Sequence, residues 1–230
     1  MNHPLDRAVW NALNTRLSTF ATPESNAHAA RIDPQVGIFM ACADGSPNSL
    51  TALGELARTY PGAGLIEREG SAIADVLPGG VSVSSRIPLV QMTAQALTAD
   101  DRSVVYETLT EVDAPAMLAL AALTKPGPFR SATRKLGPFI GVKQDGRLIA
   151  MAGRRLRVDG FTELSGICTH PDHRGRGLAA ALSRAVVAEI LASGETAFLH
   201  AFADHEATIA FYRSLGFEVR ARMTYTVLAD

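Results

Sequence analysis

A run of alternating arginine and glycine, Arg174-Gly175-Arg176-Gly177, stands directly before a segment with helical periodicity. Glycines allow a ligand to approach the backbone closely, and the arginines add positive charge beside it. Where such a turn leads from a strand into a helix, the unpaired N–H groups at the start of the helix bind phosphate or pyrophosphate. The spacing matches neither the P-loop nor the dinucleotide-binding pattern. An anion site of another kind is the favoured interpretation, and an ordinary turn is the alternative.

The segments around this run predict the α/β framework that positions it. Phe161–Thr169 has the pattern of a strand, and apolar residues at helical spacing over Leu178–Ile190 predict a helix. Ala197–Ala203 is apolar on both faces, as expected of a central strand. A second helix should end at Leu215-Gly216, and Glu218–Leu228 should form the last strand. The first strand, the first helix and the second strand are expected to make a right-handed parallel crossover.

An antiparallel meander is expected before this crossover. Val104–Leu109 has the pattern of a strand, and a helix is expected over Asp113–Leu123. Phe139–Val142 and Leu148–Leu156 are predicted to form a hairpin around Asp145-Gly146, a pair that suits a tight hairpin turn. These elements and the crossover together predict one domain over residues 99–230.

The first part of the chain has a weaker α/β pattern and no cluster of residues that points to chemistry. Ala8–Phe20 and Ser49–Tyr60 have helical spacing, and Val36–Ala41 is a short apolar run that predicts a buried strand. Val81–Val90 contains Pro88, so an edge strand or a loop is expected there. The change of pattern predicts a separate N-terminal unit over residues 1–98.

Two motifs resemble those of the GNAT N-acetyltransferase superfamily. Arg174, Gly177 and Ala179 occupy the positions of its motif A, Arg/Gln-x-x-Gly-x-Gly/Ala, and Tyr212–Phe217 matches the Tyr-x-x-Leu-Gly-Phe of its motif B. The longer run Glu163–Gly177 is most similar to the branch related to glycine N-acyltransferases. The resemblance implies an α/β (α+β) fold with a mixed, mostly antiparallel sheet and a central splayed pair of parallel strands. By analogy, the smaller N-terminal α/β region would be a degenerate copy of the same fold.

The same resemblance implies an acetyl-CoA site. The pantetheine arm would lie between the two splayed strands, and the pyrophosphate would meet the glycine-rich turn, with backbone N–H groups polarising the thioester carbonyl. The implied cofactor-binding residues are Ile167, Cys168, Thr169, Arg174, Gly175, Arg176, Gly177, Leu178, Ala179 and His205. Many members of the superfamily carry asparagine at the position of His205, so a surface histidine at a helix start is the favoured interpretation there.

Three residues are candidates for a role in acyl transfer. Tyr212 aligns with the family's general acid at the CoA sulfur, against an alternative in which it only packs a helix face. Glu163 aligns with a base that acts directly or through water, against an exposed carboxylate at a strand start, and Ser165 would lie on the same strand face. Cys168 has no partner base in the pattern, so a buried thiol is expected there, as at Cys42.

The acceptor is expected to be a small-molecule amine or an amino acid. Its site would be lined by the segment Asp113–Pro138, between the first strand of the meander and the hairpin. Arg130, Arg134 and Lys135 in this segment could attract an acidic acceptor, although a solvated basic loop is the favoured interpretation. The sequence names neither the acceptor nor the preferred acyl chain.

Composition limits other functions. The formal net charge is −1, which argues against a large nucleic-acid surface. The two cysteines have no metal-ligand spacing, so no metal is expected. No apolar run approaches the length of a membrane span and no secretory signal is expected, which makes the cytoplasm the expected compartment. A non-catalytic CoA-binding sensor is the alternative function, and a homodimer is left open.

Overall fold

Four strands pair in chain order and form the expected meander in the computed structural model, which describes residues 3–71, 73, 77, 80–100 and 103–229. They are β5 (Glu107–Leu109), β6 (Phe139–Gln144), β7 (Arg147–Val158) and β8 (Phe161–Thr169). The β6–β7 turn has positive φ at both Asp145 (50°) and Gly146 (74°), the conformation of a type I′ hairpin turn. The predicted hairpin is therefore confirmed.

The expected parallel pair is formed by β8 and β9 (Thr196–Phe202), which are connected through helix α5 (Leu178–Ala192). Their register runs from Phe161 opposite Thr196 only as far as Glu163 opposite Phe198. Both strands continue beyond this point without pairing to each other, so they diverge. The divergence leaves the amides on one edge of β8 without a strand partner, and a ligand can use them instead.

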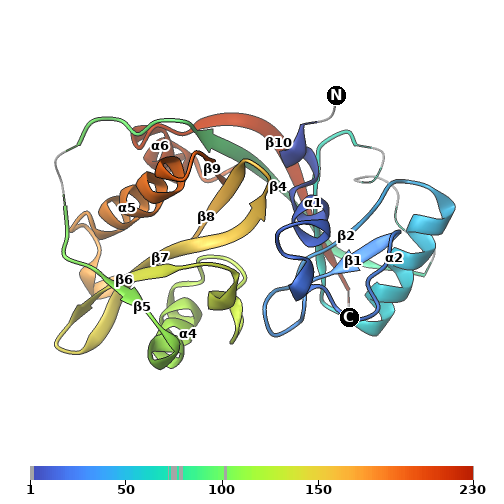
Figure 1. The fold of residues 1–230 in the computed structure, drawn as a ribbon, viewed down its shortest axis with the longest axis horizontal. Coiled ribbons are helices and arrows are strands. Elements are labelled where there is room, and N and C mark those ends of the chain that lie inside the picture. The colour runs from blue at the N-terminus through green and yellow to red at the C-terminus, as the bar shows by residue number, and fades with distance from the viewer. Residues whose placement is uncertain (1–2, 72, 74–76, 78–79, 101–102, 230) are drawn as a thin grey trace.

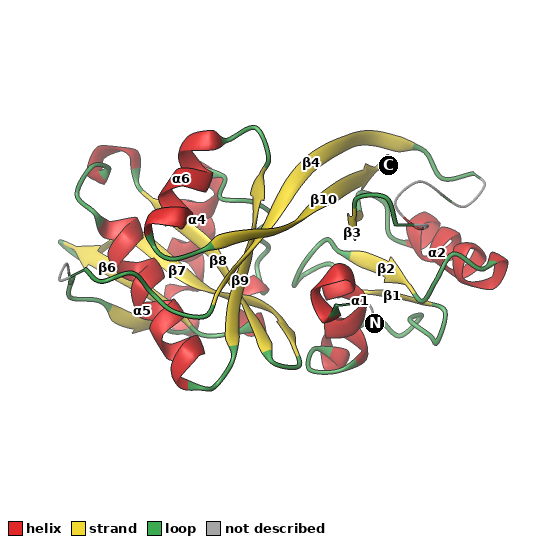
Figure 2. Ribbon diagram, turned by 90° about the horizontal axis from the view of Figure 1, so that it is seen from above, coloured by secondary structure: helices red, strands yellow, loops and turns green. Residues whose placement is uncertain are grey.

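Strand β4 (Val83–Ala94) lies inside the sheet, and the expectation of an edge strand or loop over Val81–Val90 is wrong. It pairs antiparallel with β9 on one side and with β10 (Glu218–Leu228) on the other. Pro88 is tolerated because the pairing with β9 ends at Leu89, opposite Phe202. The Pro88 carbonyl accepts from the Ala203 amide, so the missing Pro88 N–H faces the end of β9. Figure 2 shows β4 and β10 running together from one half of the molecule into the other.

The N-terminal region packs beside the sheet and also extends it. Strand β3 (Gly64–Arg68) pairs with β10, which gives the eight-stranded order β3-β10-β4-β9-β8-β7-β6-β5. Strands β1 (Ala29–Arg31) and β2 (Met40–Cys42) form a separate two-stranded sheet beside helices α1 (Ala8–Asn14) and α2 (Pro47–Thr59) (Figure 1). The sheet therefore takes strands from both sides of the predicted boundary at residue 98.

Two predicted N-terminal elements are shorter than expected. The helix over Ala8–Phe20 stops at Asn14, where the side chains of Asn14 and Thr15 bond to carbonyls one turn back and compete with the helical pattern. The strand over Val36–Ala41 begins only at Met40. Short 3-10 helices also occur in the described part of the chain, at Pro4–Arg7, Ser18–Phe20, Glu111–Asp113, Thr133–Leu136 and Pro171–His173.

Helices cover both faces of the C-terminal part of the sheet (Figure 1). Helices α5 and α6 (Glu206–Ser214) pack through Leu182 and Ile209 on the face that includes Ala150. Helix α4 (Ala114–Thr124) packs through Met117 on the opposite face, against the next residue of β7, Met151. Neighbouring strand residues point to opposite faces, so both sides of this strand are buried.

Within the described part of the chain, no helix is long and apolar enough to cross a membrane. The described residues also contain no group of three or more histidine, cysteine, aspartate or glutamate side chains placed to hold a metal ion.

Candidate functional site

The glycine-rich turn lies between β8 and α5, as its position in the sequence predicts. Gly175 and Gly177 both have a left-handed backbone, with φ of 75° and 74°, and Gly177 is the residue that precedes the first turn of α5. No atom lies within 4 Å of the position where a Cβ would stand on either glycine. The first amides of a helix have no acceptor within the helix, so they face this open space. The turn is therefore built to accept an anion.

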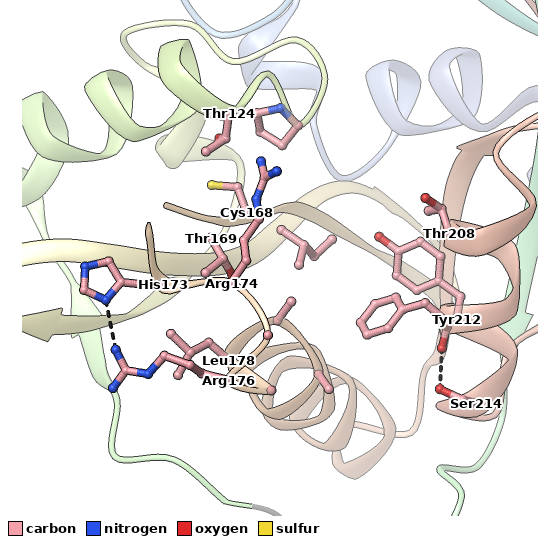
Figure 3. A pocket seen from close by; sticks show the side chains of 17 residues that line it. Thr124, Cys168, Thr169, His173, Arg174, Arg176, Leu178, Thr208, Tyr212 and Ser214 are labelled. Atoms are coloured by element: carbon pink, nitrogen blue, oxygen red, sulfur yellow. Dashed lines mark hydrogen bonds between the residues drawn. The ribbon is translucent and has the colours of Figure 1, made fainter. Parts of the chain in front are cut away.

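A cavity of about 580 Å³ opens beside this turn and extends to helix α6. Figure 3 shows Tyr212 and Thr208 on one side of it and Cys168, Thr169 and Arg174 on the other. Nine of the ten residues expected to bind the cofactor line this cavity: Ile167, Cys168, Thr169, Arg174, Gly175, Arg176, Gly177, Leu178 and Ala179.

Some polar side chains in the first cavity already have hydrogen-bond partners, and others do not. Arg176 contacts the Gln144 side chain at 3.1 Å and the His173 ring at 2.9 Å, so it is held across the outer side of the turn. The Thr169 hydroxyl is buried and has no hydrogen-bond partner among the described residues. A buried hydroxyl without a partner is costly, so a ligand with a polar group along β8 would stabilise this wall.

A second cavity, of about 280 Å³, adjoins the first. Pro126, Ile167, Thr208 and Tyr212 line both cavities, so the two meet at the divergence of β8 and β9. His205 lines the second cavity and not the first, and its side chain is 57% exposed. His205 therefore lies outside the cavity that the other nine residues line, and its exposure agrees with the favoured interpretation of a surface histidine.

Tyr212 lies on α6 at the junction of the two cavities and is buried. Its ring packs edge-on against Phe211 and Phe217, with centroids 5.1 and 5.9 Å away. Burial, with a smaller contribution from the Glu163 carboxylate, raises the pKa of Tyr212 to about 12. The hydroxyl therefore stays protonated and is available as a hydrogen-bond donor to an atom at the junction.

Glu163 is fully buried, so the alternative of an exposed carboxylate is wrong. One carboxylate oxygen accepts from Arg155 and His200, each at 2.8 Å, and the other accepts from Arg155 at 2.8 Å and from the Leu156 amide at 3.2 Å. Burial raises the pKa of Glu163, but the charge and hydrogen bonds of Arg155, together with those of His200, outweigh burial and bring it to about 2. A carboxylate with four donors and such a low pKa accepts a proton poorly, which favours a positioning role.

Gln91 on β4 fixes the tautomer of His200, and no motif in the sequence points to either residue. Arg220 donates to the Gln91 side-chain oxygen at 2.5 Å, so the Gln91 amide nitrogen faces the Leu5 carbonyl at 2.9 Å and His200 Nε2 at 3.0 Å. His200 Nε2 must then accept, and Nδ1 carries the hydrogen that it donates to Glu163. Both ring nitrogens are occupied.

Arg155 is a further residue of the candidate site that the sequence analysis did not select, although a signal for it was present. Arg155 and Glu163 carry opposite charges on the two arms of a hairpin whose turn, Asp159-Gly160, is visible in the sequence. An irregularity in the register between Arg154 and Arg157 brings them together in a way that regular pairing does not predict.

The basic residues that could attract an acidic acceptor do not line the cavities. Arg130, Arg134 and Lys135 line neither cavity, and Arg134 forms an ion pair with Glu111. From the same segment, Lys125 and the three residues after it reach the second cavity. Lys125 follows α4 with a left-handed backbone, φ 49°, which turns the chain toward the cavity.

Cys168 lines the first cavity but is a poor nucleophile. Burial raises its pKa to about 11, and burial likewise raises the pKa of Cys42 to about 11. Both thiols are therefore protonated at neutral pH, as expected for buried cysteines.

Comparison with known sequences finds a family model for the C-terminal part of the chain and relatives that match rather more than half of it. A family model described as FR47-like protein matches residues 139–227. The chain is 31% identical over 135 residues to the N-alpha-acetyltransferase RimI of Mycobacterium tuberculosis (strain ATCC 25618 / H37Rv), a match that covers 53% of this chain and 83% of that protein. It is also 31% identical over 152 residues to an uncharacterized protein of Mycobacterium leprae (strain TN), covering 58% of this chain but only 41% of that longer protein.

A solved structure from Novosphingobium aromaticivorans DSM 12444, described as an acetyltransferase from the GNAT family, is similar over the whole chain. The match covers 100% of this chain and 99% of that one, with a TM-score of 0.88 and 40% sequence identity. The shared arrangement therefore includes the N-terminal region as well as the part that contains the two cavities.

Proposed function

The chain belongs to the GNAT acetyltransferase superfamily, and on this premise we propose that it transfers the acetyl group of acetyl-CoA to a primary amine by direct attack. The observation that carries the proposal is the meeting of two cavities at Tyr212. One cavity offers a helix N-terminus suited to pyrophosphate, and the other offers separate space for an acceptor. Acyl donor and acceptor can then meet at the divergence of β8 and β9.

Acetyl-CoA fits the first cavity on three features of this chain. The left-handed glycines leave open space above the amides of α5, where a pyrophosphate would be held. The unpaired edge of β8 would bond the amides of the pantetheine arm. The buried Thr169 hydroxyl, which has no partner among the described side chains, would gain one.

In the proposed reaction the amine nitrogen attacks the thioester carbonyl carbon, the C–S bond breaks, and the amide and free CoA are the products. Tyr212 is placed to donate a hydrogen bond to the departing sulfur. Its pKa of about 12 lies above that of a thiol, roughly 8.5, so complete proton transfer from Tyr212 to the thiolate is uphill. Tyr212 therefore acts mainly by stabilising negative charge on sulfur.

In this proposal the proton lost by the amine passes to solvent and not to Glu163. Glu163 has its acceptor positions filled by Arg155, His200 and a backbone amide, and its pKa of about 2 makes it a weak base. The role that this geometry supports is a fixed, ionised group that shapes the acceptor side of the junction.

The division of the chain at residue 98 corresponds, in this proposal, to a division of tasks. Residues 99–230 supply every residue of the acetyl-CoA cavity. Residues 1–98 supply part of the acceptor cavity through Phe39, Ile66 and Leu89. The cytoplasm, where acetyl-CoA is available, is the proposed compartment.

A thermal unfolding scan tests the donor site, with acetyl-CoA and CoA as ligands and ATP as the control. Ligand at about 100 times its dissociation constant stabilises the folded state by about 2.7 kcal/mol, which for a chain of this length raises the midpoint by roughly 5 to 10 °C. A shift with both CoA forms but not with ATP supports the site. CoA release with primary amines then tests turnover. Binding without turnover of any amine would indicate a CoA-binding sensor, and no shift with acetyl-CoA would overturn the proposal.

A further inference from the structure

We infer that the second cavity selects an amine with an apolar body, branched or ring-shaped, and that the N-terminal region provides the selecting wall. This inference rests on the proposed function, because it names the acceptor class for the same site. Phe39, Ile66 and Leu89 form this wall, and they are 3%, 3% and 6% exposed. An apolar substituent on the amine would leave water when it contacts this wall, and the burial of the substituent itself would supply most of the hydrophobic energy.

The aromatic side of this wall is held in place by specific contacts. The Phe39 ring packs edge-on against Tyr225 of β10, with centroids 6.3 Å apart, and the Arg155 guanidinium lies 4.9 Å from the Phe39 ring centroid. Gly64 makes room for Tyr225, because a Cβ at this position would lie 2.4 Å from the tyrosine ring. The wall is therefore preformed and needs no rearrangement to receive a ligand.

The buried charged groups in the cavity lining do not require a charged ligand, and the exposed Lys125 keeps its own hydration. Glu163 and Arg155 satisfy each other through two hydrogen bonds of 2.8 Å. His200 uses one nitrogen on Glu163 and the other on Gln91. A polar substituent that approached Glu163, Arg155 or His200 would have to displace one of these bonds or lose its own hydration, whereas an apolar substituent there loses nothing.

The positions of the lining residues also determine how the acceptor is oriented in the second cavity. The Tyr212 side chain lies at the junction with the first cavity, whereas Phe39 and Ile66 line only the second cavity. The amine nitrogen therefore faces the thioester while the apolar body points toward the N-terminal region. The volume of about 280 Å³ is near the lower end for ligand pockets, which fits a small molecule.

The test uses primary alkylamines, whose basicity is nearly constant, with acetyl-CoA at saturation. We expect kcat/KM for isoamylamine and cyclohexylmethylamine to exceed that for ethylamine by at least about tenfold, since each buried carbon in an apolar pocket contributes a comparable factor. Ethanolamine is a weaker base, so its kcat/KM is referred to the concentration of free-base amine, and on that basis it should be no better than ethylamine. A flat series, or a preference for ethanolamine, would overturn the inference.

Two variants test whether the wall determines the selectivity between amines. They are Ile66→Ala and its matched control, Ile32→Ala. Both isoleucines are buried in the same core cluster of the N-terminal region, 3% and 1% exposed, but only Ile66 lines the cavity. Ile66→Ala should lower the isoamylamine-to-ethylamine ratio by about tenfold, and Ile32→Ala should leave the ratio unchanged. Equal changes in both variants would contradict the inference. Should either alanine variant fail to fold, Ile66→Val and Ile32→Val make the same comparison with a severalfold effect.

Failure of this inference can be distinguished from failure of the proposed function. Thermal stabilisation by acetyl-CoA reports on the first cavity alone, so its loss concerns the proposed function. If acetyl-CoA binds but no amine turns over, the same amines are scored by the additional thermal stabilisation that they give the CoA complex. The same order of amines is expected there, and a flat order would overturn the inference.

Discussion

The two cavities that meet at Tyr212 differ in how far apart their lining residues lie in the sequence. Most of the first wall comes from His173–Ala180 and from Ile167–Thr169 at the end of β8, and the open amides at the start of α5 are the groups that we propose bind the donor. The second wall combines side chains from β3, β4, β8, β9 and β10, and therefore from both ends of the chain. A donor common to many enzymes can be held by a local backbone motif, whereas an acceptor site is assembled from side chains that a motif does not contain.

Removing the charge of Glu163, which belongs to the second wall, should give the largest loss of unfolding free energy. Glu163→Gln leaves the Arg155 guanidinium buried without a counter-charge, which costs about 3–5 kcal/mol of unfolding free energy. Urea denaturation measures the loss. Glu189→Gln is the matched control, because the Arg154–Glu189 pair is half exposed and worth at most about 1 kcal/mol. Unchanged stability together with an altered pH profile of kcat would instead support Glu163 as a base.

The low pKa of Glu163 also predicts how the stability of the protein depends on pH. The folded-state pKa of Glu163, about 2, is depressed from 4.5, so its contribution to stability is fully present above pH 4.5 and is lost as the pH falls toward 2. Acid titration of stability should show this loss in the wild-type chain but not in Glu163→Gln.

Tyr212→Phe tests the junction between the two cavities. Loss of a hydrogen bond to a charged atom costs about 1.5–3 kcal/mol, so kcat should fall roughly ten- to a hundredfold while the KM for acetyl-CoA changes little. Tyr60→Phe is the control, because Tyr60 lines neither cavity and the kcat of this variant should be nearly unchanged. Burial raises the pKa of Tyr212, so the wild-type profile should show no loss from tyrosine ionisation below pH 10 or so. Equal losses in kcat and in acetyl-CoA affinity would argue against this role.

Gly177→Ala changes the first wall and should give the smallest loss of free energy among these variants. A left-handed backbone costs a residue with a Cβ about 1–2 kcal/mol, and the strain here would disturb the turn at the start of α5. Gly194→Ala provides the control at the other end of the same helix, with φ of 78° and equally open surroundings. Both variants should lose similar stability, but only Gly177→Ala should raise the KM for acetyl-CoA. A similar KM change in both would mean that the turn does not bind the donor.

These differences also explain what the sequence could predict. Helix periodicity, the Asp145-Gly146 turn and the apolar β9 predict local elements, and the turn Arg174–Gly177 predicts an anion site, because each depends on neighbouring residues. The placement of β4 inside the sheet depends on where β9 ends relative to Pro88, which only the tertiary structure decides. The Gln91–His200 contact joins residues 109 positions apart, and no local pattern reports such a pair.

The position of β10 has a consequence for how the chain acquires its structure. The last strand of the chain lies between β3 and β4, which are made much earlier during synthesis. Until the C-terminal residues are available, β3 and β4 have no strand between them, and β4 exposes an edge that can pair with other chains. Pairings of such high sequence separation are slow to form because a long loop must close first. The interval between synthesis of β4 and insertion of β10 is therefore when this protein is most exposed to aggregation, and chaperone dependence should be concentrated there.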